Sequence, residues 1–297
     1  MRRLLFAALM CGGMATPSLA QQVPARDLLD FPIGSIAEPA ALSVLLSSGL
    51  WNPAAVAMPA GERVQLGIVA LNSPIEQGVS AQLGAVSIAL PRAFVLTTSL
   101  LKATITDLVP TQTDPQSLGG EIPYGTTVFS AGLSRRFGGL VAGAEARVRT
   151  GTVDYIQRSA FSLDWGVVAD SLFRTPVRLA ASTFLLSPTP SRERATILGA
   201  ADVPVARRGS LFEVRAGVAA SASDGRGHED YFYGTVRYAA LEARGGLART
   251  HEFGTTSNHL RLGLDLRYGR YAVGIAREQE GAGLGAVYQF MLTSVFR

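Results

Sequence analysis

Histidine and cysteine, two residue types that often build catalytic or metal centres, are scarce in this chain of 297 residues. The three histidines, His228, His251 and His259, lack the short spacing of a metal-binding motif. The only cysteine, Cys11, lies in a segment that we expect to be removed. No G-x-S-x-G nucleophile motif is present. We therefore expect no catalytic residue, no metal site and no cofactor.

The charged residues, in contrast, follow a regular pattern. Residues 259–268 read HLRLGLDLRY, in which leucines alternate with polar side chains. A period of two places alternate side chains on opposite faces of a β-strand. In a membrane β-barrel the apolar face meets lipid and the polar face meets the lumen. We expect the following residues to line a lumen: Glu145, Arg147, Asp164, Arg178, Glu213, Arg215, Glu242, Arg244, Arg261, Asp265 and Arg267.

These lumen charges carry both signs, so we expect charges on facing strands to pair across the barrel and most of them to be held in ladders of salt bridges. The alternative is an arginine-biased lumen that selects ions. A filled or plugged barrel fits the mixed signs better than an open pore of one sign.

The alternating pattern recurs along the chain from residue 62 to its end. It predicts an all-β fold, a transmembrane antiparallel β-barrel of about 14 strands, with a barrel domain over 62–297. Gly138-Gly139 predicts a hairpin turn, and the segment 102–124 a long extracellular loop. The expected strands are 62–70, 82–90, 94–100, 127–137, 140–150, 161–168, 177–185, 195–205, 212–219, 232–238, 241–247, 259–268, 271–276 and 286–296.

Residues 1–20 have the features of a secretory signal peptide: two arginines, an apolar run and a small-x-small cleavage site at 18–20. Residues 21–61 form an N-terminal segment, of which we expect 21–37 to be a periplasmic lead-in. Pro39 and Gly49 favour a short helix over 40–48. Trp51, Asn52, Pro53 and Ala54 then break it. This segment is predicted to plug or gate the lumen, or simply to pack at the barrel's start.

An exported chain with no apolar run long enough for a membrane helix points to the bacterial outer membrane. The alternative is a periplasmic all-β protein. The expected partners are outer-membrane lipid and the barrel assembly machinery, because the last strand carries in-phase aromatic residues up to Phe296. The net charge of +4 includes Arg2 and Arg3 of the signal, and no basic run suggests nucleic acid.

Two short motifs resemble a known superfamily. The sequence Leu50-Trp51-Asn52-Pro53-Ala54 before the first strand, and Asp164-Trp165-Gly166 within a later one, resemble the FadL-like long-chain fatty acid transporters, and within them the PorV/PorQ branch associated with type IX secretion. The resemblance implies a barrel with an N-terminal segment in its lumen, joined to the wall at Asn52-Pro53-Ala54.

The resemblance also implies a function. FadL-like transporters move hydrophobic compounds, often through a lateral opening in the wall, so we expect passive transport of small hydrophobic molecules. The alternative is a non-transporting accessory barrel that tethers or shuttles a secreted protein, as in the PorV-like branch. A lipid-remodelling or proteolytic barrel enzyme is a third, and we expect the chain not to be an enzyme.

Overall fold

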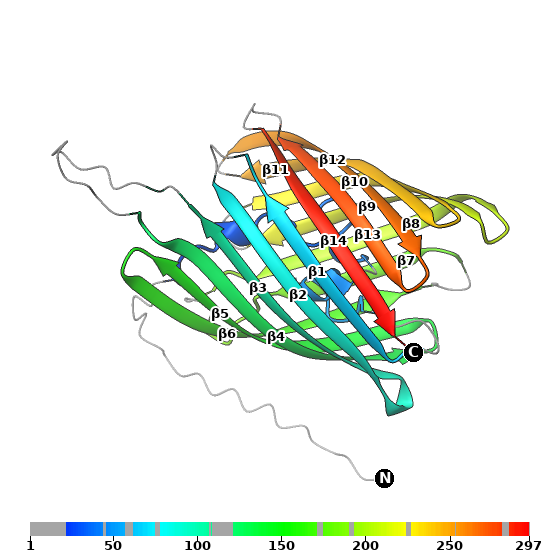
Figure 1. The fold of residues 1–297 in the computed structure, drawn as a ribbon, viewed down its shortest axis with the longest axis horizontal. Coiled ribbons are helices and arrows are strands. Elements are labelled where there is room, and N and C mark those ends of the chain that lie inside the picture. The colour runs from blue at the N-terminus through cyan, green and yellow to red at the C-terminus, as the bar shows by residue number, and fades with distance from the viewer. Residues whose placement is uncertain are drawn as a thin grey trace, which may run out of the picture.

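The computed structural model is a closed antiparallel barrel of fourteen strands, in which each strand pairs with its sequence neighbours and β1 pairs with β14 (Figure 1). It describes residues 22–43, 46–56, 62–74, 78–106, 108, 121–170, 175–189, 193–223, 227–252, 254–280 and 285–296. The strands are β1 Val64–Asn72, β2 Val79–Leu90, β3 Phe94–Ile105, β4 Tyr124–Phe137, β5 Leu140–Val153, β6 Ile156–Ala169, β7 Arg178–Phe184, β8 Thr196–Arg208, β9 Phe212–Ser223, β10 Gly227–Tyr238, β11 Leu241–Glu252, β12 Thr255–Tyr268, β13 Tyr271–Glu280 and β14 Ala286–Phe296.

The predicted fold class and strand number are confirmed, and so is the Gly138-Gly139 turn between β4 and β5. Several strands are longer than expected. β10 begins at Gly227, so His228 lies on a strand and not in a polar loop, and β11 continues to Glu252. These extensions carry polar side chains on both faces, and alternation of apolar and polar residues therefore could not reveal them.

The predicted helix over 40–48 is not formed. Turns occupy 40–42, and a short 3₁₀ helix, η2 (Leu46–Leu50), follows; residues 44 and 45 lie outside the described residues. The other short 3₁₀ helices are η1 (Asp27–Leu29) and η3 (Pro91–Ala93). No helix among the described residues is long and apolar enough to cross a membrane.

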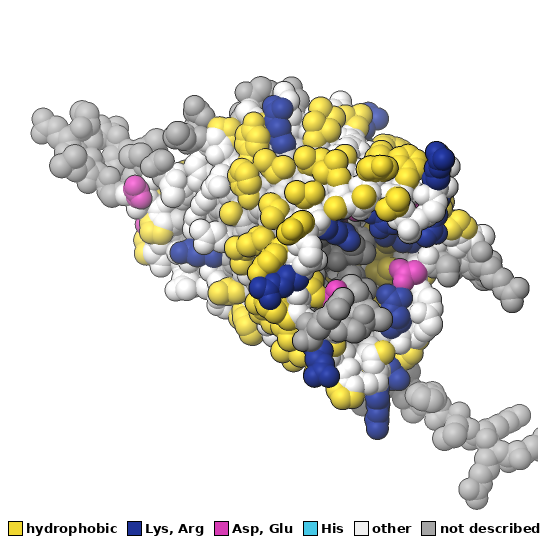
Figure 2. All heavy atoms as spheres, turned by 45° about the vertical axis from the view of Figure 1, so that its right-hand side comes forward, with side chains coloured by type: hydrophobic (Ala, Val, Ile, Leu, Met, Phe, Trp, Pro, Cys, Tyr) yellow, Lys and Arg dark blue, Asp and Glu magenta, His cyan; other side chains and the backbone are white. Residues whose placement is uncertain are grey.

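The outer wall is apolar. Leu260, Leu262, Leu264 and Leu266 are about half exposed, while Arg261 on the same strand is buried. Hydrophobic side chains cover the wall in Figure 2, and charged side chains gather around the hollow at the end that faces the viewer. An apolar wall around a closed ring of hydrogen-bonded strands is the arrangement that crosses lipid, which makes this an outer-membrane barrel.

The two ends of the barrel differ in their connections. The end that holds the start of β1 and the end of β14 carries tight turns, such as 138–139, 239–240 and 269–270. The opposite end carries the longest connection, between β3 and β4. Short turns face the periplasm and long loops the exterior in such barrels, so we assign the ends accordingly.

The N-terminal segment 22–56 fills part of the lumen (Figure 1). Arg149 of β5 donates to the carbonyls of Val23 and Pro24, and Gln289 of β14 accepts from the Gly34 amide at 2.7 Å. Residues 22–37, expected as a periplasmic lead-in, therefore lie instead inside the extracellular half of the barrel. The segment then descends toward the periplasmic end, where Leu46 contacts Gly67 of β1.

The lumen has an apolar and a charged half. The inward side chains of β1 to β4 are mainly apolar or small, and the apolar side chains of segment 22–56 pack against them. The inward side chains of β5 to β13 include most of the charges. Burial of apolar surface against this half stabilises the position of the segment, with a free energy of roughly 25 cal/mol per Å² of apolar surface buried. Members of this core include Leu28, Leu29, Ile33, Ile36, Leu50, Leu71, Leu83, Leu101 and Val128.

Leu264→Arg tests which face of β12 meets lipid. Leu264 points outward near the middle of the apolar band, so arginine there should reduce the free energy of unfolding by about 2–4 kcal/mol. Asn258→Arg, at the outward-facing extracellular end of the same strand, should cost about 0–1 kcal/mol. Denaturant unfolding in lipid vesicles measures both. Equal costs at the two positions would contradict the assigned membrane band.

Candidate functional site

The Asn52-Pro53 turn is seated on two glycines of the wall. Gly143 of β5 and Gly166 of β6 are direct cross-strand partners. A Cβ at Gly143 would lie 2.6 Å from the Pro53 backbone, and one at Gly166 would lie 1.9 Å from Asn52 Oδ1. The two motifs that carried the family resemblance therefore meet in space. Asn52 and Pro53 are recognisable in the sequence, whereas the glycine seat depends on strand register and could not be predicted from it.

The turn is also held by its own hydrogen bonds. Asn52, fully buried, donates from Nδ2 to the Ala41 carbonyl at 2.7 Å and accepts the Ala54 amide at 2.9 Å. The adjacent Trp51 donates from Nε1 to the Ile33 carbonyl at 2.8 Å. All side-chain polar groups of Trp51 and Asn52 are therefore engaged, which fixes the turn.

Trp51 and Phe184 form an aromatic contact between the segment and the wall. Their ring centroids are 4.6 Å apart at an interplanar angle of 42°. Phe184 is the last residue of β7 and is fully buried, and the guanidinium of Arg147 lies 4.8 Å from its ring centroid. Such contacts add about 0.5–1.5 kcal/mol beyond burial. This pair packs the N-terminal segment against the wall at the level where β7 ends.

The structure places all eleven predicted lumen residues on the inward side, and each makes at least one ion pair. Arg147 Nη2 lies 2.6 Å from Glu145, and its Nε lies 3.2 Å from Asp164, with all three side chains buried. Arg261 donates two bonds of 2.8 Å to Glu229. The other pairs that these residues form are Arg178–Asp202, Arg215–Asp202, Arg215–Glu213, Arg237–Glu213, Arg244–Glu38, Arg244–Glu242, Arg244–Asp265, Arg261–Glu278 and Arg267–Glu242.

Several residues in these pairs were not predicted from the sequence. Asp202 is buried between Arg178 and Arg215, but the register shift between Pro204 and Ala206 made the faces of this strand ambiguous. Glu38 belongs to the N-terminal segment, which has no alternation at all. The only feature that distinguishes Glu38 in the sequence is its position as a single acidic residue immediately before the apolar run 39–60.

Two cavities lie between the N-terminal segment and the charged half of the wall. The first, about 270 Å³, lies toward the extracellular end and is lined by β8 to β13, with Leu29, Phe31 and Trp51 among its apolar walls. The second, about 230 Å³, lies toward the periplasmic end between β7 and β12. Glu38 and Pro39 line both cavities.

The barrier between the two cavities is ionic. Glu38 contacts Arg244, which also lies 2.7 Å from Asp265 and 2.8 Å from Glu242. Three carboxylates share one arginine, and the Arg244 and Glu38 side chains are only 3% and 7% exposed. An apolar molecule that crossed here would have to separate buried charges without replacing their partners, at a cost of several kcal/mol.

The wall itself is incomplete between β6 and β7. β6 pairs with β5 over its full length of fourteen residues but with β7 only from Gly166 to Ala169. Beyond Gly166, single hydrogen bonds replace the ladder. The Trp165 amide donates to Thr183 Oγ1 at 3.0 Å, and the Leu163 amide donates to the Leu186 carbonyl at 2.9 Å. No described residue forms a ladder with Ile156–Ser162 on this side.

Asp164 organises this gap. Its carboxylate accepts the amides of Leu185 and Leu186 at 3.1 and 2.8 Å, and it also pairs with Arg147. Leu185, directly after β7, has a φ of 58°, a left-handed conformation that is unfavourable for a leucine. The Asp164 bonds compensate this strain and hold segment 185–186 against β6.

Above the gap, Glu193 in the β7–β8 connection pairs with Arg149 at 2.6 Å, and both side chains are 1% exposed. Burial raises the pKa of the Glu193 carboxyl, and Arg149 opposes that rise only in part. Because Arg149 also holds Val23 and Pro24, this pair ties the connection, the wall and the N-terminal segment together.

Comparisons with known proteins bear on the fold. No protein-family model matches the chain, and no curated protein matches it. The solved structure of the toluene transporter TbuX of Ralstonia pickettii is similar, with 11% identity, a TM-score of 0.57, and 90% of this chain and 98% of that one covered. A FadL homologue of Pseudomonas aeruginosa has 10% identity and a TM-score of 0.55, with 89% and 98% covered. This chain has a FadL-like barrel fold.

Gly143→Ala tests the glycine seat. A methyl group there would clash with the Pro53 backbone, so we expect a loss of about 1–3 kcal/mol in the free energy of unfolding. Gly84→Ala is the matched control, because a Cβ at Gly84 meets nothing within 4 Å. Unfolding in vesicles compares them. An unchanged stability of Gly143→Ala would mean that the turn does not rest on β5.

Removal of the Glu38–Arg244 pair tests the ionic barrier. The double variant Glu38→Ala/Arg244→Ala should join the two cavities and raise single-channel conductance in a planar bilayer severalfold over the native protein. The control is Arg136→Ala/Asp170→Ala, which removes an exposed pair at 2.6 Å near the periplasmic turns. If the barrier variant conducts no better than this control, ions do not pass between the cavities.

Proposed function

We propose that this barrel mediates passive transport of small hydrophobic molecules across the outer leaflet, from the first cavity to the bilayer through the gap between β6 and β7. The proposal rests on the incomplete β6–β7 ladder, which lies next to the Trp51–Phe184 contact. Trp51 lines the first cavity, and Phe184 ends the strand at the gap.

The size and lining of the first cavity support a small substrate. Its volume of about 270 Å³ is at the lower edge of the ~300–1,000 Å³ usual for ligand pockets. Apolar side chains such as Leu29, Phe31 and Trp51 line it on the side of the N-terminal segment, and polar side chains such as Glu229 and Arg261 line it on the side of the wall. Toluene, which the transporter TbuX carries, is a substrate of this size.

A lateral exit is favoured over a path straight through the barrel. The direct path crosses the Glu38–Arg244 cluster, where an apolar molecule would disrupt buried ion pairs. The lateral path crosses the Trp51–Phe184 contact and passes beside the buried Arg147–Asp164 and Arg149–Glu193 pairs, which need not separate, through a wall held by only a few hydrogen bonds. Its outer surface carries exposed Leu163 and Trp165, so a hydrophobic molecule would leave directly into lipid.

The alternative function, tethering of a secreted protein, would depend on extracellular loops that grip it. The longest expected loop, 102–124, lies mostly outside the described residues, and no described feature favours this alternative over transport. A role as an enzyme likewise gains no support from the ion-paired side chains of the lumen.

A reversible lock on the gap tests the proposal. Leu163→Cys/Leu186→Cys would join two outward side chains whose backbones are hydrogen-bonded, and the predicted mature chain has no other cysteine. Uptake of radiolabelled toluene by cells that carry this variant should fall severalfold when the disulfide forms and recover on reduction. The control, Val148→Cys/Phe161→Cys, joins direct partners in the complete β5–β6 ladder and should transport equally in both states.

Uptake that is unaffected by the oxidised lock, with the disulfide verified by mass spectrometry, would contradict the lateral exit. Uptake no greater than in cells without the protein would contradict transport of this molecule altogether.

A further inference from the structure

We propose that His228, Asp230 and His251 form a binding site for a divalent transition-metal ion such as Zn²⁺, on the outer wall at the extracellular ends of β10 and β11. Each of the three side chains offers a ligand atom, and these atoms all lie within 4.8 Å of one another. Imidazole and carboxylate groups are the ligands that zinc takes in many proteins. The three side chains lie on the outward face of the strands, and the proposal does not depend on the proposed transport.

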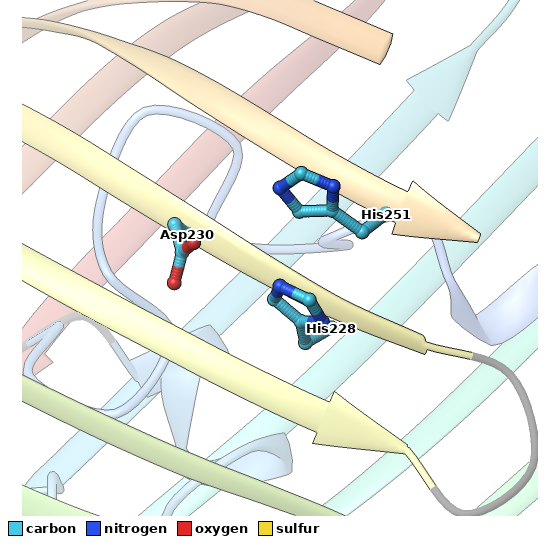
Figure 3. Close-up of side chains that lie close together, drawn as sticks. All are labelled: His228, Asp230 and His251. Carbon is cyan, nitrogen blue, oxygen red and sulfur yellow. The ribbon is translucent and has the colours of Figure 1, made fainter. Parts of the chain in front are cut away.

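Strand register creates the cluster. His228 and His251 are 23 residues apart in sequence but are direct partners in the β10–β11 ladder. Their rings stack with centroids 4.4 Å apart at 23°, and Asp230 lies two residues further along β10 on the same face (Figure 3). The spacing of the histidines along the chain does not reveal this cross-strand pairing, so no metal site was expected from the sequence.

The position of the cluster leaves it open to ions. The next outward residues toward the membrane centre are Phe232 and Leu247, about half exposed, which mark the start of the apolar band. His228 is exposed, and Asp230 and His251 are partly exposed. The cluster therefore lies beyond the hydrocarbon region, where water and metal ions have access.

The surroundings of His251 suit a metal ligand. Its Nδ1 lies 2.9 Å from Thr256 Oγ1 on β12, so Nδ1–H can donate to that hydroxyl and leave Nε2 with a free lone pair. Ligand histidines commonly donate their second ring nitrogen to such a partner. The opposing influence is Arg249, the cross-strand partner of Asp230, whose positive charge competes for the carboxylate.

Three protein ligands leave at least one coordination position for water or an external donor. A bound ion would also connect β10 to β11 at the extracellular rim, where Gly227 and His228 border the first cavity. Small rotations of the three side chains are required, because ligand atoms around zinc lie about 2.0–2.2 Å from the ion.

Calorimetric titration of the untagged barrel in detergent with ZnCl₂ tests the site. The native protein should bind one zinc ion, and His228→Ala or His251→Ala should weaken binding at least about tenfold, as loss of even an outer-shell partner costs 10–100-fold. Arg249→Gln should strengthen it. The matched control is His259→Ala, which removes the inward-facing histidine that contacts Ser257 and should leave zinc binding unchanged. MgCl₂, a hard cation, should give no comparable binding.

A second readout separates a site from a folding effect. Zinc should raise the thermal unfolding midpoint of the native protein and of His259→Ala, since a ligand that binds only the folded state stabilises it. It should not raise that of the His228→Ala/His251→Ala variant. Absence of zinc binding by the native protein, or equal binding by the double variant, would overturn the proposal, and so would loss of binding on His259→Ala.

Discussion

Closure of the hydrogen-bonded ring is the constraint on which the structure depends. In the hydrocarbon region no water can satisfy a free amide or carbonyl, so fourteen strands must pair around a complete circle. The circle leaves an interior that must itself be filled. The apolar half of the lumen receives segment 22–56, and the charged half pairs its own side chains and retains the two cavities.

The places where this constraint is relaxed are the places where function is expected. The β6–β7 ladder stops after four pairs, and the polar groups beside the break are satisfied by Asp164 and by segment 185–186 instead. A few side-chain hydrogen bonds can break and re-form more readily than a β-ladder. In addition, the Leu185 backbone is already in an unfavourable conformation. The described part of the wall with the fewest ladder pairs therefore lies next to the Trp51–Phe184 contact.

Much of the fold could be predicted from the sequence, because lipid and lumen impose a two-residue period on every strand. The fourteen strands and the inward position of residues such as Arg147 and Asp265 follow from that period alone. The alternation of apolar and polar residues cannot be recognised where both faces are polar, as at the extracellular end of β10. It is also lost where a β-bulge shifts the faces, as after Pro204. Contacts between distant segments, such as Asn52 with Gly166 or His228 with His251, depend on register and were not accessible.

Enclosure of segment 22–56 also bears on how the protein is assembled. The segment is covalently joined to β1, and it occupies a ring that is sealed where β1 meets β14, the last strand to be synthesised. Its ion pair with Arg244 involves β11, and its seat on Gly143 and Gly166 involves β5 and β6, so these contacts lie away from the seam. Once the seam is sealed, threading these residues in from one end would require passage of bulky side chains such as Trp51. We therefore expect the segment to be enclosed as the two edges of the sheet join, and not to enter the lumen afterwards.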